Sequence, residues 1–275
     1  MKRIITAAVI LPFLISSILV SWLQPLFVVL IAAALALALL EFWKLAKRRG
    51  MKPDIAAGYL GAAAIFTVFF FNEPSQDFFS LQLLLLTLVV LTMGTLAAAT
   101  FRGAPFDTMI SSTGATLLGV LYIVLLGGHI VALRTGFSQK LSAHLLSFFF
   151  LVIMGSDTGA YYVGRTFGKH KLAPKISPGK TWEGVIGGLL AGLLMSALAH
   201  FWFFRELPLK LALPLAVVMV VLGIIGDLTE SALKRSAGAK DAANLLPGHG
   251  GVLDRLDSLL FNAPLIYYFA RIYFQ

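Results

Sequence analysis

The sequence has no cysteine and is poor in charged residues. Only 13% of its 275 residues are Asp, Glu, Lys or Arg, whereas a soluble globular domain carries about 25%. The lack of cysteine excludes disulfides and thiolate chemistry but does not identify a compartment. No internal repeat, soluble domain or low-complexity tail is evident either. A surface that faces water needs more charge than this, so the sequence predicts a protein that lies in a membrane.

Long apolar runs make up most of the chain, and 59% of its residues are hydrophobic. A run of about 20 apolar residues is long enough to cross a bilayer as a helix. The runs are continuous and do not alternate with polar residues, which favours helices over a β-barrel. We therefore predict an all-α polytopic membrane protein with about nine transmembrane helices. The expected spans are residues 4–21, 25–43, 55–71, 78–100, 108–133, 142–163, 183–204, 209–228 and 256–273.

The distribution of Lys and Arg predicts the orientation of these spans. With the N-terminus in the cytoplasm, 17 of the 22 basic residues fall in cytoplasmic segments, as expected from the excess of positive charge on that side. Nine spans then place the C-terminus outside. The remaining five bases lie in segments expected outside: Arg134, Lys140, Arg205, Lys210 and Arg271.

The net charge of +9 does not indicate a nucleic-acid partner, because the bases lie in short loops between apolar runs. The orientation bias and attraction to anionic lipid account for most of them. We expect a multi-pass protein of the inner (plasma) membrane. Its two most polar segments, after the sixth and eighth spans, both face the cytoplasm. We accordingly divide the chain into scaffold helices at 1–140 and helices that carry a cytoplasmic-side site at 141–275.

Acids and their polar neighbours recur at helical spacing around the last loop. If these residues are helical, each set shares one face, and two acidic helix ends that face each other can supply oxygen ligands to Mg²⁺. The alternative is a pair of solvated, salt-bridged helix ends. The two sets are Asp227, Glu230, Ser231 and Lys234, and then Asp254, Asp257 and Ser258.

The loop between these sets is rich in glycine from Pro247 to Gly251, with His249 among the glycines. Glycines allow backbone N–H groups to approach an anion closely; a flexible turn is the alternative. The bases nearby either neutralise phosphate groups or follow the orientation bias, and the residues alone leave both open. These bases are Lys234, Arg235, Lys240 and Arg255.

A second polar group lies at the end of the sixth span. Asp157 is more than one turn inside that span, where an acid is costly and by default indicates a function, although a hydrogen-bonded structural Asp is the alternative. Ser177 and Thr181 are expected to cap the seventh helix. Gly179-Lys180-Thr181 is not a phosphate-binding P-loop, because Pro174 stands where that motif needs glycine.

Residues 231–257, the signature segment, resemble the phosphatidate cytidylyltransferase family, also called CDP-diacylglycerol synthases. The family pattern is S-x-x-K-R, then K-D, P, H-G-G and D-R-x-D at fixed spacing. Asp157 and Lys180 also fill key positions of two earlier family segments. The positions that fill the pattern without gaps are Ser231, Lys234, Arg235, Lys240, Asp241, Pro247, His249, Gly250, Gly251, Asp254, Arg255 and Asp257.

The resemblance implies that CTP and phosphatidate react to give CDP-diacylglycerol and pyrophosphate, with Mg²⁺ as cofactor and a second cation left open. Asp227 and Asp254 match the family's metal ligands, with Asp257 in support, and His249 is expected to orient a phosphate and not to act as a base. The residues expected in catalysis are Asp227, Lys234, Lys240, Asp241, His249 and Asp254. Those expected to bind substrate are Asp157, Ser177, Lys180, Ser231, Arg235, Gly250, Gly251 and Arg255.

Two other functions are kept as alternatives. A CTP-dependent lipid-alcohol kinase would need a base for its lipid hydroxyl, and the complete signature argues against it. A transporter predicts inverted repeats and polar residues at mid-membrane, but no repeat is evident and the polar residues gather toward one side. The sequence does not fix acyl-chain preference or oligomeric state, and a homodimer is carried as one alternative.

Overall fold

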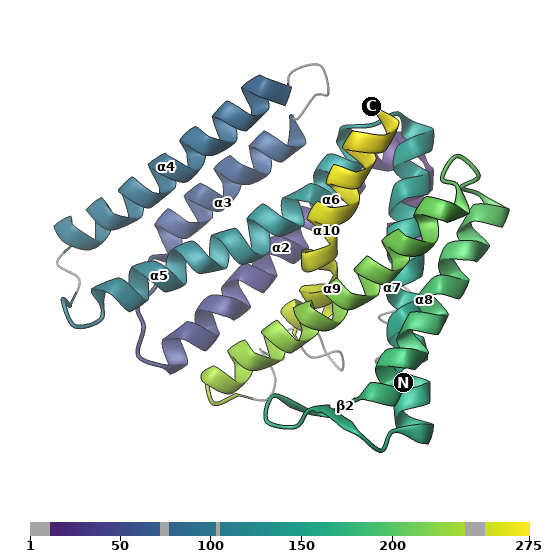
Figure 1. Cartoon of the computed structure of the whole chain (residues 1–275). Coiled ribbons are helices and arrows are strands. Elements are labelled where there is room, and N and C mark those ends of the chain that lie inside the picture. Colours follow the sequence, from purple (N-terminus) through teal and green to yellow (C-terminus); the bar gives the residue numbers. More distant parts are fainter. Residues whose placement is uncertain (1–11, 72–76, 103–104, 240–250) are drawn as a thin grey trace.

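The structure is a computed structural model that describes residues 12–71, 77–102, 105–239 and 251–275 (Figure 1). Helices account for nearly all of the described chain. They are α2 (Gln24–Arg48), α3 (Ile55–Phe70), α4 (Asp77–Phe101), α5 (Met109–Gly119), α6 (Leu126–Thr135), α7 (Gln139–Phe167), α8 (Trp182–Trp202), α9 (Leu209–Ser236) and α10 (Leu253–Phe274). A π-helical turn at Val120–Leu125 joins α5 to α6 without a break, and residues 12–19 form a further helix.

The described residues contain six helices long and apolar enough to cross a membrane, and α3 is a shorter apolar helix. This confirms an all-α polytopic membrane protein. Helices coincide with predicted spans two to nine, while most of residues 4–21 lie outside the described part. The number of crossings and the side on which each terminus lies stay predictions. The six are Ser21–Arg48, Ser80–Phe101, Met109–Thr135, Gln139–Phe167, Trp182–Trp202 and Leu209–Ser236.

Local signals explain several helix starts. Pro25 lies in the first turn of α2, where its missing N–H costs nothing. Asp54 caps α3 by accepting the N–H of Ala57 at 3.0 Å, and Thr181 caps α8 by accepting the N–H of Gly184 at 3.1 Å. The expected cap at Thr181 is thereby confirmed. Ser177 is not a cap, because it begins a strand.

Two features depart from the expected architecture. Residues between α7 and α8 form an antiparallel β-hairpin, β1 (Lys171–Ala173) and β2 (Ser177–Thr181), which an all-α prediction misses. Helix α9 also continues to Ser236, well beyond the predicted end of its span at 228. Asp227 therefore lies inside α9 and not at its end, and the expected facing pair of helix ends at Asp227 and Asp254 is wrong in this respect.

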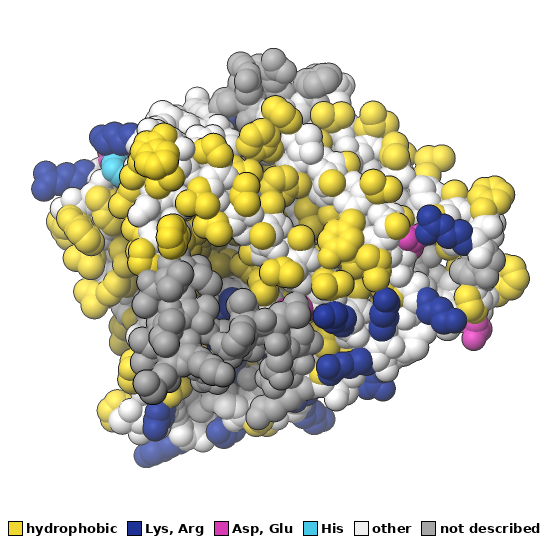
Figure 2. All heavy atoms as spheres, turned by 180° about the vertical axis from the view of Figure 1, so that it is seen from behind, with side chains coloured by type: hydrophobic (Ala, Val, Ile, Leu, Met, Phe, Trp, Pro, Cys, Tyr) yellow, Lys and Arg dark blue, Asp and Glu magenta, His cyan; other side chains and the backbone are white. Residues whose placement is uncertain are grey.

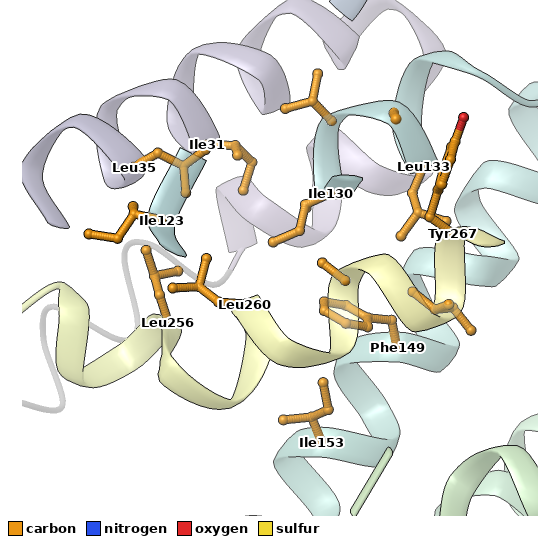
Figure 3. Packing of buried hydrophobic residues seen from close by; sticks show 14 of the residues in the cluster. Ile31, Leu35, Ile123, Ile130, Leu133, Phe149, Ile153, Leu256, Leu260 and Tyr267 are labelled. Atoms are coloured by element: carbon orange, nitrogen blue, oxygen red, sulfur yellow. The ribbon is translucent and has the colours of Figure 1, made fainter. Parts of the chain in front are cut away.

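Helix α10 runs through the middle of the molecule, between α9 and α6, and it also touches α2 and α7 (Figure 1). Its apolar face supplies much of the core. In Figure 3, Leu256 and Leu260 of α10 point toward Leu35 of α2 and Ile123 of the π-helical turn. Leu260, Leu35 and Ile123 are all at most 2% exposed. The N-terminal and C-terminal helices thus share one core around α10.

Helices α7 and α8 approach each other closely because glycines line their contact. A Cβ atom on Gly159 would lie 2.7 Å from the carbonyl oxygen of Gly187, and one on Gly188 would lie 3.1 Å from that of Ser156. Small residues at such spacing let helix backbones come together in a membrane. The spacing of Gly184, Gly188 and Gly192 by four residues on α8 serves this helix packing, with Gly192 facing Val220 of α9.

The two ends of the helix bundle carry different polar contacts. At one end Glu206 accepts a hydrogen bond from the Nζ of Lys140 at 2.6 Å, and this ammonium holds the pKa of Glu206 below its usual range. At the other end Asp54 pairs with Arg102. Partial burial would raise the pKa of Asp54, but the N–H of Ala57 and the guanidinium of Arg102 outweigh it and lower the pKa. Between the ends, Figure 2 shows a broad apolar surface with many Lys and Arg along its lower edge.

Candidate active site

A cavity of about 570 Å³ opens where α7, the hairpin, α8, α9 and α10 meet. It is the place where the structure gathers most of the polar side chains singled out in the sequence. Four acids and three bases line it, among apolar residues such as Leu172, Val185 and Ile224. The acids are Asp157, Asp227, Asp254 and Asp257, and the bases are Arg165, Lys180 and Arg255.

Lys180 of β2 crosses to α9 and pairs with Asp227. Its Nζ lies 2.6 Å from Oδ2 of Asp227, and the two side chains are 22% and 38% exposed. The hydroxyl of Ser231, one turn further along α9, lies 3.4 Å from the other carboxylate oxygen. The pair brings together two residues that are distant in the sequence, and it leaves part of the Asp227 carboxylate open to the cavity.

Lys234 forms a second, more buried ionic group. Its Nζ lies 2.5 Å from Glu230 on the same helix and 2.6 Å from Asp254 at the start of α10. The second oxygen of Asp254 accepts the N–H of Gly251 at 3.0 Å. Glu230 is 1% exposed, and its Oε1 has no hydrogen-bond partner among the described residues. One ammonium thus holds two carboxylates and ties α9 to α10.

The backbones of α9 and α10 come into contact beside these pairs. A Cβ atom on Gly226 would lie only 2.5 Å from the carbonyl oxygen of Asp257. One turn earlier on α9, the carbonyl of Gly223 accepts a hydrogen bond from the Ser258 hydroxyl at 3.2 Å. The absence of a side chain at 226 therefore sets Asp227 and Asp257 on closely packed helices.

The hairpin that presents Lys180 is held at its base. Glu183, in the first turn of α8, accepts the N–H of Lys169 at 3.1 Å and bonds to Nδ1 of His170 at 2.6 Å. Arg235 of α9 donates from Nε to the carbonyl of Ile176 at 3.2 Å. These bonds fix the base of the hairpin and its turn, so Lys180 is presented to the cavity by a braced strand.

Comparison with known proteins identifies the family. The sequence profile of the Cytidylyltransferase family matches residues 1–273. The phosphatidate cytidylyltransferase of Pseudomonas aeruginosa is 37% identical over 268 residues, which are 96% of this chain and 94% of that protein. The chain belongs to the Cytidylyltransferase family. The Bacillus subtilis protein of the same name is 34% identical over 258 residues, 90% of this chain and 89% of its own length.

A shorter part of the chain is more alike. The phosphatidate cytidylyltransferase of Haemophilus influenzae is 48% identical over 129 residues, which are 46% of this chain and 45% of that protein. The chain thus matches about half the length of this relative.

The structure brings together most of the predicted site residues that it describes. Asp157, Lys180, Asp227, Asp254, Arg255 and Asp257 line the cavity, Lys234 and Ser231 bond to those acids, and Gly251 bonds to Asp254. Arg235 instead braces the hairpin and reaches the carbonyl of Ala239 at 3.5 Å. Ser177 lies on β2 but does not line the cavity. Four predicted residues lie outside the described part: Lys240, Asp241, His249 and Gly250.

Two residues with clear structural roles at the site were not predicted there. Glu183 holds the hairpin, and Glu41 of α2 bonds to the start of α10. From the sequence both are interpreted only as acids at helix ends, and the partners of Glu41 lie more than 200 residues away.

The donor set suits Mg²⁺ in chemistry, although no group of three acids or histidines within the described residues is close enough to hold a metal ion. Carboxylate oxygens are the ligands that Mg²⁺ prefers, usually with substrate phosphates completing the shell. The Asp227 side chain is 38% exposed and so partly open to the cavity, whereas that of Asp254 is only 17% exposed and is held by Lys234 and Gly251. A site built from one or two protein carboxylates and substrate is compatible with this arrangement.

Proposed function

We propose that the chain is a phosphatidate cytidylyltransferase, which makes CDP-diacylglycerol and pyrophosphate from CTP and phosphatidate. The observation that supports this most is the cavity at which Lys180 pairs with Asp227, and which is also lined by Asp254, the partner of Lys234. It lies at one end of apolar helices, where a lipid headgroup and a water-soluble nucleotide can meet. The names of the relatives that match nearly the whole chain agree with it.

The reaction needs charge neutralisation more than proton removal. A phosphate oxygen of phosphatidate attacks the α-phosphorus of CTP; the new P–O bond forms as the bond to the β-phosphate oxygen breaks, and pyrophosphate leaves. The attacking oxygen is already anionic, so no strong base is required. Positioning and electrostatic stabilisation then supply most of the rate. Lys180, Arg165 and Arg255 line the cavity and are the proposed phosphate contacts.

We propose Asp227 as the main protein ligand for Mg²⁺, with Asp254 and Asp257 in support and a second cation left open. A bound Mg²⁺ neutralises charge on the phosphates and on the leaving pyrophosphate. Lys180 pairs with Asp227 at 2.6 Å and lines the same cavity. Its ammonium is therefore placed to contact a substrate phosphate.

The product of the reaction tests the proposal against its alternatives. Purified protein is incubated with Mg²⁺, phosphatidate and CTP labelled either at the α-phosphate or at the γ-phosphate. The expected result is an α-labelled CDP-lipid and γ-labelled pyrophosphate, both dependent on Mg²⁺. A γ-labelled lipid phosphate with a lipid alcohol as substrate would instead establish the kinase, and lipid or solute flux without CTP would favour a transporter.

We further propose that residues 1–140 form a scaffold and residues 141–275 carry the site. Every described residue that lines the candidate active-site cavity lies between Asp157 and Ser258, which supports this division. We also propose that the protein lies in the inner membrane with the cavity open to the cytoplasm, the compartment that contains CTP. A homodimer stays an untested expectation.

Cysteine labelling tests the orientation, because the chain has no cysteine of its own. Lys175 lies in the hairpin turn and Arg205 in the connection after α8, at opposite ends of α8; both are exposed. In intact cells an impermeant thiol reagent should label Arg205→Cys and should reach Lys175→Cys only after the membrane is opened. The opposite pattern would invert the proposed orientation, and equal labelling of both would show that α8 does not cross the membrane.

A further inference from the structure

Glu41 is an acid buried inside an apolar helix. It is 0% exposed in α2, and both of its carboxylate oxygens bond to the backbone of another helix. Oε1 accepts the N–H of Val252 at 3.0 Å, and Oε2 accepts the N–H of Leu253 at 2.8 Å. The first N–H groups of a helix have no partner within that helix. Glu41 supplies the partners that α10 lacks, since no side chain of its own N-cap residue does so.

The same helix also reaches the end of α9. Arg49, which follows the last residue of α2, donates a hydrogen bond from Nε to the carbonyl of Ser236, the last residue of α9. An acid stabilises the N-terminal end of a helix and a base stabilises the C-terminal end. The acid Glu41 therefore meets the N-terminal end of α10, and the base Arg49 meets the C-terminal end of α9, so both charges are the stabilising ones.

These contacts lie directly beside the two residues that join α9 to α10. Lys234 is two positions before Ser236, and Asp254 is one position after Leu253. The Nζ of Lys234 and Oδ1 of Asp254 are 2.6 Å apart. Asp254 and Asp257 both lie in the first turns of α10. A displacement of the start of this helix would therefore move both carboxylates relative to Asp227 on α9.

We propose that Glu41 is a positioning residue of the active site, which acts through the first turn of α10, with Arg49 as a weaker support at the end of α9. The inference rests on the proposed cytidylyltransferase activity. It assigns part of the active-site geometry to a helix of the N-terminal half, outside the signature segment. Glu41 contacts backbone N–H groups of α10, so its role is to fix the place and direction of Asp254 and Asp257.

A positioning role and a purely structural role predict different kinetics. If Glu41 only stabilised the fold, its replacement would reduce the amount of folded protein and leave the turnover of each folded molecule unchanged. If it positions carboxylates for the transition state, kcat falls while substrate binding changes little. Glu41→Gln suits this test, because it keeps the shape but offers one acceptor oxygen and turns an amide N–H₂ toward the second backbone N–H.

Arg134 provides the matched control. It is also a buried charged residue of the N-terminal half, 1% exposed, with hydrogen bonds to the carbonyl of Ser17 at 3.3 Å and to Oε1 of Gln139 at 2.6 Å. Arg134→Gln removes a charge that is as buried as that of Glu41, but the hydrogen-bond partners of Arg134 do not line the cavity. Loss of stability alone should therefore affect both variants in the same way.

In Glu41→Gln we expect kcat per folded molecule to fall by about tenfold or more, with KM for CTP and for phosphatidate within about threefold of wild type. Glu41→Asp keeps the carboxylate and should recover part of the loss, and the exposed Arg49→Met should lower kcat by about threefold. Arg134→Gln should lower the thermal midpoint but keep the wild-type kcat. Wild type is assayed alongside, so absence of CDP-lipid there would count against the proposed function and not against the role of Glu41.

Hydrogen exchange supplies a readout that does not depend on activity. Peptides covering residues 251–257 should exchange their amides at least about tenfold faster in Glu41→Gln than in wild type, because the bonds to Val252 and Leu253 are weakened. Arg134→Gln should leave these amides unchanged. Unchanged exchange at 251–257, wild-type kcat in Glu41→Gln, or an equal loss of kcat in Arg134→Gln would each overturn the proposal. If Glu41→Gln does not fold, wild-type kcat in both Glu41→Asp and Arg49→Met would do so.

Discussion

Replacement of Asp227 by Asn is expected to lower turnover by at least about a thousandfold, since it removes several kcal/mol of charge stabilisation from the transition state. The amide keeps the shape of the side chain but loses the charge that holds Lys180 and, in the proposed mechanism, the cation. Asp227 is 38% exposed, so the variant should still insert and fold. Initial rates of CDP-lipid formation at several Mg²⁺ concentrations measure the effect.

Glu206→Gln is the control for this experiment. It also removes a partly exposed carboxylate from a pair with a lysine, again at 2.6 Å, but at the opposite end of the bundle. Its turnover and Mg²⁺ dependence should match wild type. Full Mg²⁺-dependent turnover in Asp227→Asn would remove Asp227 from the metal site and leave Asp254 and Asp257 as the candidate ligands.

Replacement of Lys234 by Met should both destabilise the protein and abolish activity. Lys234 is 14% exposed and is the shared partner of Glu230 and Asp254. Breaking a buried ionic group by removal of one partner costs about 3–5 kcal/mol, because the remaining charge is left uncompensated. The thermal midpoint in detergent should fall by several degrees, and CDP-lipid formation should fall below detection.

A double variant separates these two effects. Glu230→Gln removes the buried carboxylate that Lys234→Met leaves without a cation, so the pair Lys234→Met with Glu230→Gln should regain most of the stability. Activity should stay absent, because Asp254 still lacks its ammonium partner. Recovery of turnover together with stability would show that Lys234 serves the fold and not the reaction.

The sequence predicted the membrane helices well because a bilayer imposes one simple requirement on them. A continuous apolar run of sufficient length must be helical in lipid, so helices were found at predicted spans two to nine. The predicted end of α9 was wrong for a related reason. Hydropathy detects only the apolar part of a helix, whereas the last turns of α9 are polar and continue through Lys234 and Arg235 to Ser236.

The β-hairpin could not be predicted from local preference. Ser177 to Thr181 reads S-P-G-K-T, which has a proline and a glycine and no alternating apolar residues, and such a segment has little strand propensity. Bonds from outside hold it: Arg235 reaches Ile176, and Glu183 reaches His170. Tertiary contacts therefore decide its structure.

The site was partly predictable because its residues occupy a dense and specific pattern. Asp157, Lys180, Asp227 and Asp254 were named from the sequence, and the structure places all four at one cavity. The pairing of Lys180 with Asp227 was not foreseen, since nothing in the amino-acid sequence alone relates these two positions. Glu41 was missed for the same reason: its role depends on a helix that begins more than 200 residues later.

The contact at Gly226 has a consequence for how this cavity can vary. A methyl group there would meet the Asp257 carbonyl oxygen at 2.5 Å, so any other residue would force α9 and α10 apart. Both helices carry carboxylates that line the cavity. The distance between the helices therefore depends on position 226 having no side chain beyond a hydrogen atom. The apolar lining at Leu172, Val185 or Ile224 can vary in size without moving the helices, whereas the distance between the acidic helices leaves no such freedom.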